Sequence, residues 1–358
     1  MRWFTVIALL VGCVPAAVKP EAAAPLAVHE VPWNPQHVDV GAVSAVAESG
    51  DLLVLFGDKG ASVFVGGANV ATDASVTAWR TAGTLPAPDG SGTWIVGVDG
   101  KGTLYRLRAR TSLEPVSARF GLGATPIRAL GAIGGLRHAF LLEGSVAICE
   151  GPQLTRFDGA FAALAAGGET LAELFDRGVR VGGKGGDRTY ALEGPRLLAV
   201  DPTGKTWVAT ERALYGDEGD RLKLRYVGER IDALAPAADG AWLTDGAALV
   251  KVGPQGFSRG FRASPRTRLA PAPNGDVWML GEGAPLRLSL GADTWPAGLY
   301  QRVCATCHAK NGFDLSSEAA WKAKKALLRK RVIDDQDMPP AGTPMSAEDR
   351  AVVEAWTR

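Results

Sequence analysis

A glycine followed closely by a strand tryptophan recurs along the middle of this chain, and it constrains the fold more than any other feature. The strong copies place their tryptophans at Trp94, Trp207, Trp242 and Trp278, each after a polar turn. The last three recur about every 35 residues, which is close to the length of one four-stranded propeller blade. We therefore predict an all-β propeller over residues 36–292.

Weaker copies of the same pattern fill the gaps between the strong ones, at Gly50–Leu55, Ala139–Leu142 and Thr170–Phe175. Together the copies predict about seven four-stranded blades, with six or eight left open. At these strand positions the tryptophans are expected to be packing residues between blades. A propeller has to close its ring, because an open sheet edge invites aggregation. We expect His37–Val40 to pair with the last blade as its outer strand.

The motif Cys304-Ala-Thr-Cys307-His308 carries the most specific chemistry in the chain. On a helix, positions i, i+3 and i+4 share one face, so the two thiols and the imidazole would point at one object. The spacing C-x-x-C-H is typical of covalent c-type haem attachment, with the histidine as an axial iron ligand. The alternatives are a disulfide, half a zinc site or a thioredoxin-like redox pair. This region offers neither the further Cys or His residues nor the βαβ setting that a zinc site or redox pair would require.

Met338 is predicted to be the second axial ligand of the haem iron. A thioether sulfur is a known haem ligand, and Pro339 and Pro340 stiffen the loop that would present it. Met345, in a similar loop, is the competing candidate. With both axial positions filled, the iron would have no open site for a substrate, which favours electron transfer.

Residues 295–358 resemble a small class I monohaem cytochrome c domain. The residues that carry the resemblance are Gly298, Tyr300, Cys304-Ala-Thr-Cys-His308, Asn311-Gly312, Leu315, Arg331, Met338-Pro-Pro340 and Trp356. The resemblance implies an all-α domain in which the first and last helices cross, and it implies electron transfer as the activity. It also offers Arg331 as a contact to a haem propionate. The family commonly has a proline about ten residues after the haem-binding histidine; residues 310–315 lack one, so the acceptor of the His308 ring N–H is not identified.

Within this domain we expect helices over residues 297–308, 317–333 and 346–358. The second would carry a basic face made of Lys322, Lys324, Lys325, Arg329 and Lys330. That face is either an ordinary solvated surface or a docking patch for an acidic redox partner. A domain this small buries little apolar surface of its own, so the haem is expected to complete its core.

Residues 1–13 are expected to be an export signal. An apolar run ends in Leu10-Val11-Gly12-Cys13, which resembles a bacterial lipobox and implies acylation of Cys13. The alternative is an ordinary signal peptide with an incidental cysteine. Residues 14–35, rich in Ala and Pro, would tether the folded part to the membrane, which predicts a periplasmic or cell-envelope location.

The remaining features are expected to be structural. The formal net charge of +1 gives no indication of nucleic-acid binding. Cys149 is expected to be a buried free thiol, while His29, His37 and His138 show no metal-ligand spacing. Arg177, Arg180, Lys184 and Arg188 would form a solvated face.

Two functional classes remain open. The first is an exported haem c protein that carries electrons to or from a redox partner protein, with the propeller as scaffold or partner platform. The second is a redox enzyme or ligand sensor in which the propeller binds a ligand and the haem accepts its electrons. The propeller resembles those of two-component sensor proteins, but only through the glycine–tryptophan motif, which says little about function. The sequence does not identify the redox partner, the oligomeric state or a catalytic residue.

Overall fold

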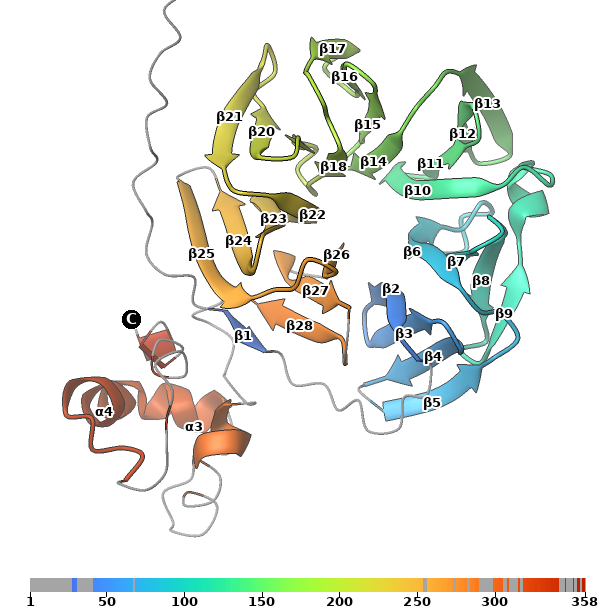
Figure 1. The fold of residues 1–358 in the computed structure, drawn as a ribbon. Helices are drawn as coiled ribbons and strands as arrows, with labels where there is room; N and C mark the ends of the chain where they lie inside the picture. Colours follow the sequence, from blue (N-terminus) through green and yellow to red (C-terminus); the bar gives the residue numbers. More distant parts are fainter. Residues whose placement is uncertain are drawn as a thin grey trace, which may run out of the picture.

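The computed structural model describes residues 28–30, 41–66, 68–253, 256–272, 275–281, 284–289, 299–304, 308, 315, 318–340, 345, 350, 353–354 and 356–357. Their strands form seven four-stranded antiparallel sheets arranged as a ring of blades (Figure 1). In the first six blades the chain runs from the strand nearest the ring axis outward through all four strands. This is a seven-bladed β-propeller, so the blade number left open by the sequence is seven.

The first three blades occupy residues 43–158. Blade 1 contains β2 (Val43–Ser49), β3 (Leu52–Gly57), β4 (Gly60–Val65) and β5 (Ala68–Asp73). Blade 2 contains β6 (Trp79–Pro86), β7 (Thr93–Asp99), β8 (Leu104–Arg108) and β9 (Ser112–Pro115). Blade 3 contains β10 (Ile127–Gly134), β11 (Arg137–Leu142), β12 (Ser145–Glu150) and β13 (Gln153–Asp158), after a short 3-10 helix, η1 (Ser117–Phe120).

The next three blades follow the same order. Blade 4 contains β14 (Ala163–Gly167), β15 (Thr170–Phe175), β16 (Gly178–Gly182) and β17 (Arg188–Ala191). Blade 5 contains β18 (Leu197–Val200), β19 (Thr206–Ala209), β20 (Ala213–Asp217) and β21 (Leu222–Val227). Blade 6 contains β22 (Ile231–Ala237), β23 (Gly240–Asp245), β24 (Ala248–Gly253) and β25 (Gly256–Arg262).

Blade 7 is assembled from both ends of the propeller sequence. It contains β26 (Arg268–Pro271), β27 (Val277–Leu280) and β28 (Leu286–Ser289), with β1 (His29–Glu30) as its outer strand. The predicted closure by an N-terminal strand is confirmed, but the predicted segment is wrong. His29 pairs with Ser289 and Glu30 with Leu288, whereas residues 37–40 lie outside the described part of the chain. The neighbouring Val28 is buried in the core shared by blades 6 and 7, and this apolar contact fixes β1 in place.

Every copy of the sequence repeat, strong or weak, is the second strand of its blade. The strands in question are β3, β7, β11, β15, β19, β23 and β27. This position lies between the innermost strand and the third strand, and it is almost completely buried in β19, β23 and β27. The period of the repeat therefore reports the spacing of the blades directly.

The repeat tryptophans pack between blades, as predicted. Trp207, Trp242 and Trp278 are at most 1% exposed, and each indole N–H has a hydrogen-bond acceptor. In blade 5 the acceptor is Asp201, 3.1 Å from Nε1 of Trp207. The same carboxylate accepts the backbone N–H groups of Thr203 and Lys205, so it closes the turn as well as satisfying the indole. Trp94 is half-buried instead, and the guanidinium of Arg106 lies 4.3 Å from its ring centroid.

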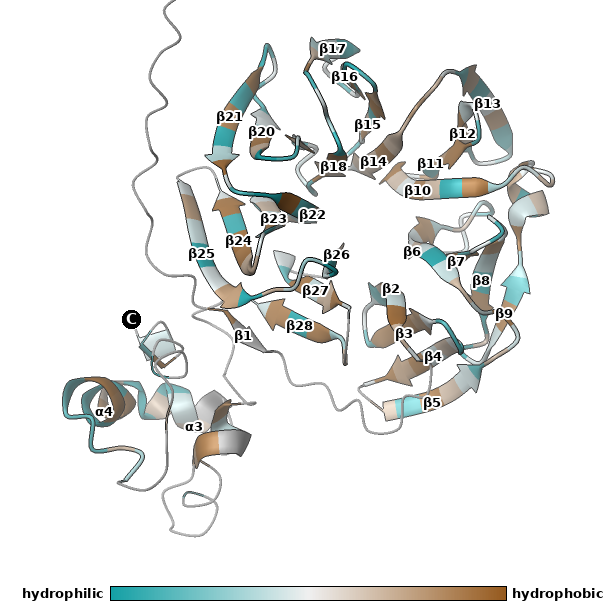
Figure 2. Cartoon of the chain, in the orientation of Figure 1, coloured by the Kyte–Doolittle hydropathy of each residue, from teal (hydrophilic) through white to brown (hydrophobic). Residues whose placement is uncertain are grey.

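The hydrophobic core of the ring is divided among the interfaces between blades. The innermost strands are mostly apolar, whereas outer strands such as β13 and β21 carry more polar residues (Figure 2). Small residues on the innermost strands let neighbouring blades approach closely. A Cβ added to Gly131 of β10 would lie 2.8 Å from the Cβ of Ala166 on β14 in the next blade, for example, which would force one of them to move.

The C-terminal residues that the structure describes are largely helical. They comprise η3 (Tyr300–Cys304), α3 (Glu318–Ala323), α4 (Lys325–Leu328) and η4 (Arg329–Asp334), where η3 and η4 are π-helical. The helix predicted over residues 317–333 therefore corresponds to a nearly continuous helical run. The predicted helices over residues 297–308 and 346–358 lie partly outside the described residues. Among the described helices, none has the length and apolar character that a membrane crossing requires.

Candidate functional site

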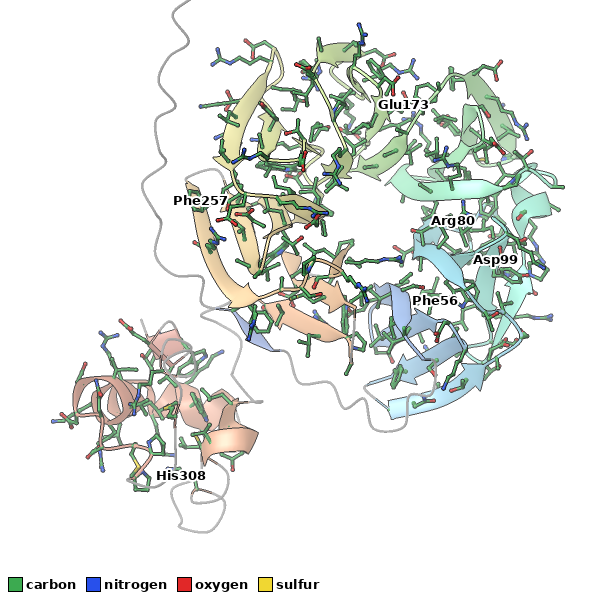
Figure 3. All side chains as sticks on the ribbon, viewed as in Figure 1. Phe56, Arg80, Asp99, Glu173, Phe257 and His308 are labelled. Carbon is green, nitrogen blue, oxygen red and sulfur yellow. The ribbon has the colours of Figure 1, made fainter. Side chains whose placement is uncertain are left out.

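A cavity of about 280 Å³ lies among the C-terminal helical segments. Its walls are mainly apolar, and they combine residues from all of these segments with single residues from the connections. The lining residues are Val303, Cys304, His308, Leu315, Trp321, Leu327, Leu328, Arg331, Val332, Met338, Pro339, Pro340, Met345 and Val353. Figure 3 labels His308 within this part of the molecule.

Two tryptophans fix the packing behind this cavity. Trp321 and Trp356 meet edge to face, with ring centroids 5.4 Å apart, and both are almost completely buried. The indole N–H of Trp321 donates to the backbone oxygen of Leu315 at 2.8 Å, which ties the connection before α3 to the helix. These contacts give the apolar wall a defined shape.

The segment that carries Met338 is held to the end of the helical run. The backbone N–H groups of Asp337 and Met338 both donate to the carbonyl oxygen of Arg331, at 3.1 and 3.2 Å. The side chains of Arg331 and Asp337 also form an ion pair, with Nε and Oδ1 2.7 Å apart. This hydrogen bond raises the pKa of the Arg331 guanidinium, which stays charged. Three contacts therefore position Met338, which is half-buried against the core.

The cavity brings together most of the residues that the sequence predicts for a haem site. Cys304, His308, Arg331 and Met338 all line it, although they are spread over more than thirty positions of the chain. Met345 lines it too, so both methionine candidates face the same space. Cys307, the second predicted attachment residue, and Cys13, the predicted lipidation site, lie outside the described residues.

The donor set around the cavity, which is one thiol, one imidazole and two thioethers, suits a haem. No group of three His, Cys, Asp or Glu side chains that could hold a metal lies among the described residues. A haem iron needs only two protein ligands from opposite faces, and a neutral imidazole and a thioether serve this purpose. The apolar wall also matches the porphyrin, which provides its own nitrogen ligands.

Within the propeller, Cys149 and His138 form a buried pair on adjacent strands. They face each other across β11 and β12 and are at most 1% exposed. The Cys149 thiol donates to the carbonyl oxygen of Phe120 at 3.6 Å, and burial raises its pKa to about 11. Burial lowers the pKa of His138, and neither of its ring nitrogens has a hydrogen-bond partner. The expectation of a buried thiol is confirmed.

The basic residues of blade 4 do not form the simple solvated face that the sequence suggested. Arg180 pairs with the buried Glu173 at 2.5 Å, and Lys184 pairs with Glu169 at the same distance. Arg188 contacts Asp217 of the next blade at 3.2 Å. These are ion pairs within and between blades, and sequence analysis missed them because the acidic partners lie on other strands or, for Glu169, in the turn between β14 and β15.

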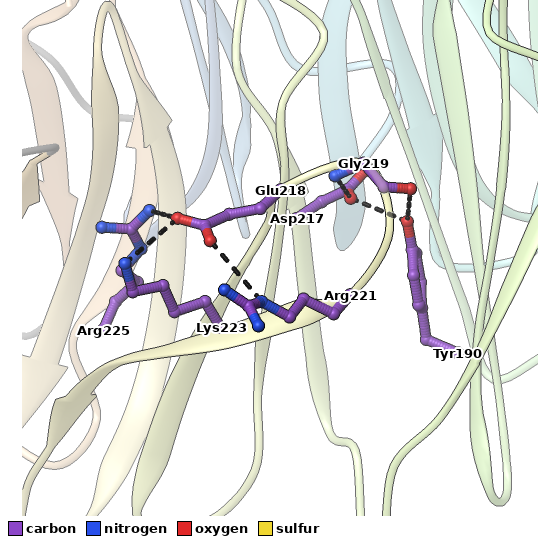
Figure 4. Close-up of polar contacts among 7 residues, drawn as sticks. All are labelled: Tyr190, Asp217, Glu218, Gly219, Arg221, Lys223 and Arg225. Carbon is purple, nitrogen blue, oxygen red and sulfur yellow. Dashed lines mark hydrogen bonds and ion pairs between the residues drawn. The ribbon is translucent and has the colours of Figure 1, made fainter.

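Tyrosine–aspartate hydrogen bonds link the outer strands of blades 4 and 5 to the blades that follow them. The Tyr190 hydroxyl donates to Asp217 at 2.8 Å (Figure 4), and the Tyr226 hydroxyl donates to Asp245 at 2.7 Å. Burial and the carboxylate raise the pKa of Tyr190 to about 12 and also raise that of Tyr226. Figure 4 also shows Glu218 surrounded by Arg221, Lys223 and Arg225 from β21 and the turn before it.

A second cavity, of about 570 Å³, lies between blades 4 and 5. It is open, and its lining combines apolar surface with five charged residues: Asp176, Glu193, Arg196, Glu211 and Arg212. Sequence analysis missed it because these residues come from three separate connections. Only the packing of the two blades brings them together.

Comparison with solved structures defines the class of fold. A streptogramin B lyase has a TM-score of 0.54 at 12% identity, covering 74% of this chain and 97% of the lyase. The extracellular domain of the hybrid two component system protein BT3049 from B. thetaiotaomicron has a TM-score of 0.53 at 13% identity, covering 74% of this chain. PorZ, a surface component of the type-IX secretion system of Porphyromonas gingivalis, has a TM-score of 0.52 at 11% identity, also covering 74%. The chain spans only 41% of the BT3049 domain and 38% of PorZ.

These likenesses, all at low identity, establish the propeller fold and nothing finer. No family model matches the chain. No curated protein matches it either.

Proposed function

We propose that this chain is an exported, lipid-anchored monohaem c-type cytochrome that carries electrons, with its propeller as a scaffold or partner platform. The observation that supports this most is the apolar cavity lined by Cys304, His308 and Met338. These are the residues that the C-x-x-C-H motif and the Met-Pro-Pro run assign to haem attachment and iron ligation.

Each group has a distinct role in this proposal. Cys304 and Cys307 would hold the haem through thioether bonds, and the bound haem would supply one-electron redox chemistry. His308 and Met338 would ligate the iron and would leave it no site for a substrate. The apolar wall excludes water, which favours the reduced iron because it carries less charge. Arg331 and Asp337 hold the Met338 segment, and the Arg331 guanidinium at the cavity is available to a propionate.

The proposed location rests on two kinds of support. The N-terminal residues resemble a lipoprotein signal that ends at Cys13, and acylation would attach the protein to a membrane without crossing it. Two proteins of the same fold are described as an extracellular domain and a bacterial surface component. A cell-envelope location agrees with both, and with the assembly of c-type haem outside the cytoplasm.

The test is an optical spectrum of the protein after expression with a bacterial c-type haem maturation system. We expect the bands of a low-spin c-type haem, covalently retained under denaturing conditions. The reduced protein should bind carbon monoxide poorly, because Met338 fills the sixth position. The Met338→Ala variant should bind it readily, while the matched Met345→Ala variant should behave like the wild type.

Two results would contradict the proposal. If the mature protein were colourless, it would hold no haem. Ready binding of carbon monoxide by the wild type would show an open iron site and would favour an enzyme or gas sensor over an electron carrier. If only Met345→Ala opened the site, the ligand would be Met345 and the carrier function would stand.

The open cavity between blades 4 and 5 favours a second candidate function, in which the propeller binds a small ligand and the haem accepts its electrons or reports on it. Three carboxylates and two guanidinium groups lining about 570 Å³ could bind a polar, zwitterionic ligand. A change in haem potential on addition of such a ligand, abolished by Arg212→Gln, would support this candidate.

A further inference from the structure

Five blades place an arginine where their innermost strand begins. Arg80 and Arg128 are the second residues of β6 and β10, and Arg268 is the first residue of β26. Arg196 and Arg230 immediately precede β18 and β22. All five side chains are exposed. The positions are spread over blades 2, 3, 5, 6 and 7, so they do not form a run in the sequence.

The topology gathers these arginines at one end of the ring axis. The innermost strands surround the axis (Figure 1), and consecutive ones contact each other from β2 through β26. All of them run in the same direction along the axis, because every blade has the same strand order. Their first residues therefore form a circle around one mouth of the propeller, which we call the basic mouth. Figure 3 labels Arg80 on its blade.

Most of the charge in the basic mouth is not neutralised. Arg80 donates only to the backbone oxygen of Gly100, at 2.9 Å. Arg230 forms an ion pair with Asp232 at 2.8 Å. In the part of the chain that the structure describes, no carboxylate pairs with Arg128, Arg196 or Arg268. Four of the five arginines thus keep their positive charge exposed.

The rim around the basic mouth is close to neutral. It is formed by the turns after the second strands, which lie at the same end because the first two strands of a blade are antiparallel. In blades 1, 4 and 5 these turns carry adjacent acidic and basic residues: Asp58-Lys59, Asp176-Arg177 and Glu211-Arg212. Positive charge is therefore concentrated at the centre and cancels at the edge.

The opposite mouth carries acidic residues instead. The turns after the innermost strands contain Asp51, Asp89, Glu169 and Asp239, all of them exposed. Two are paired with lysines, Glu169 with Lys184 and Asp239 with Lys251, both at 2.5 Å. Because the whole chain has a formal net charge of only +1, the basic mouth results from how charges are distributed along the axis and not from composition.

We propose that the basic mouth is a docking site for a projecting acidic segment of a partner protein. Exposed guanidinium groups bind carboxylates through paired hydrogen bonds, and a circle of them can bind several side chains of one segment. A flat anionic membrane would meet the rim first, where the charges cancel. A narrow acidic loop or terminus can reach the centre. This inference concerns the propeller alone and does not depend on the haem.

The test measures binding of a fluorescent oligoglutamate peptide to the full-length protein by anisotropy, with an oligoglutamine peptide for comparison. The mouth variant combines Arg80→Gln, Arg128→Gln and Arg268→Gln. It leaves Arg196 in place, because that residue also lines the cavity between blades 4 and 5. The control variant removes three exposed arginines elsewhere on the propeller by the changes Arg110→Gln, Arg137→Gln and Arg262→Gln. It has the same net charge as the mouth variant.

We expect the wild-type and control proteins to bind the acidic peptide at low ionic strength and to lose it in high salt. The mouth variant should bind it at least about tenfold more weakly. Thermal unfolding and circular dichroism should be alike for the three proteins, because all six arginines are exposed.

Three outcomes would overturn the inference. Equal losses in the mouth and control variants would show that only net charge matters. Unchanged binding by the mouth variant, with loss in a Lys325→Gln, Lys330→Gln variant, would place the binding on the C-terminal helical run. Arginine-dependent binding to vesicles of anionic lipid, without binding to the peptide, would identify a membrane surface as the occupant.

Discussion

At the residue scale, Cys149 shows how burial alone sets the chemistry of a side chain. The thiol lies in β12, with His138 opposite on β11 and the carbonyl oxygen of Phe120 as its acceptor. Desolvation disfavours the thiolate and is the largest contribution to the raised pKa, whereas the charge of Arg156 acts weakly in the other direction. Cys149 is therefore unreactive in the folded protein, unlike a catalytic or redox-sensing cysteine.

The raised pKa predicts that the propeller loses stability in alkali. The folded state holds the Cys149 proton up to about pH 11, whereas the pKa of an unperturbed thiol is 9.0. The stabilising contribution is therefore complete below pH 9 and is lost as the pH rises towards 11, by roughly 2–3 kcal/mol in total. The free energy of unfolding of the Cys149→Ala variant should fall less steeply over this range than that of the wild type. Urea unfolding at a series of pH values measures this free energy. If it fell equally steeply with pH in the two proteins, this explanation would be wrong.

A few side chains could be assigned a role from the sequence, and others could not. Cys149 could be predicted as a buried thiol because the other three cysteines had stronger assignments. The roles of Arg180 and Arg188 could not be predicted, because their partners Glu173 and Asp217 lie on a neighbouring strand and in the next blade. Charge by itself does not indicate whether a side chain is solvated or paired.

At the scale of strands, the hydrogen bonds from Tyr190 and Tyr226 show how the outer part of one blade is joined to the next. Tyr226 lies on β21, and Asp245 ends β23 of the following blade. The Asp245 carboxylate is completely buried and also accepts the backbone N–H groups of Glu229 and Arg230. Because one hydroxyl and two backbone N–H groups donate hydrogen bonds to it, this charged carboxylate can remain buried between two blades.

The Tyr226→Phe variant should be less stable than the wild type by about 1–3 kcal/mol, because it leaves an oxygen of the buried Asp245 carboxylate without its hydroxyl donor. Tyr215→Phe is the matched control, since Tyr215 is half-buried on β20 and no hydrogen bond of its hydroxyl is seen in the described structure. Denaturant unfolding of the three proteins measures the difference. Equal stability of Tyr226→Phe and the wild type would mean that water or Arg259 replaces the hydroxyl.

At the scale of the whole molecule, the ring is closed by side chains as well as by β1. Arg287 on β28 contacts Glu48 of blade 1 at 2.7 Å and Asp276 of its own blade at 3.0 Å. Glu48 also accepts the indole N–H of Trp278 at 3.2 Å. These residues join the last blade to the first, and the apolar core between them includes Trp278, Leu280 and Phe64.

The Arg287→Gln variant should weaken this closure strongly. It leaves two mostly buried carboxylates, Glu48 and Asp276, without their shared cation, which should cost about 3 kcal/mol. A loosened blade 7 would also expose strand edges, so aggregation on heating should increase. Arg262→Gln, at an exposed position, is the control for loss of one positive charge. Thermal unfolding with light scattering tests both effects, and equal behaviour of the two variants would contradict this role of Arg287.

The sequence by itself indicated a β-propeller and the approximate number of its blades. The glycine–tryptophan copies predicted a propeller of about seven blades, because each copy is the second strand of a blade and the signal is local to one hairpin. The C-x-x-C-H motif is also local, because its five residues are adjacent, and it predicts haem attachment.

Only the tertiary structure decided which segment closes the ring, which charges pair and where the remaining positive charge lies. The outer strand of blade 7 is His29–Glu30 and not His37–Val40, because Val28 fills a core built from residues more than two hundred positions away. Arg287 and Glu48 are 239 positions apart, and the arginines of the basic mouth come from five blades. Such contacts depend on how distant segments meet in space, and no local pattern in the sequence records that.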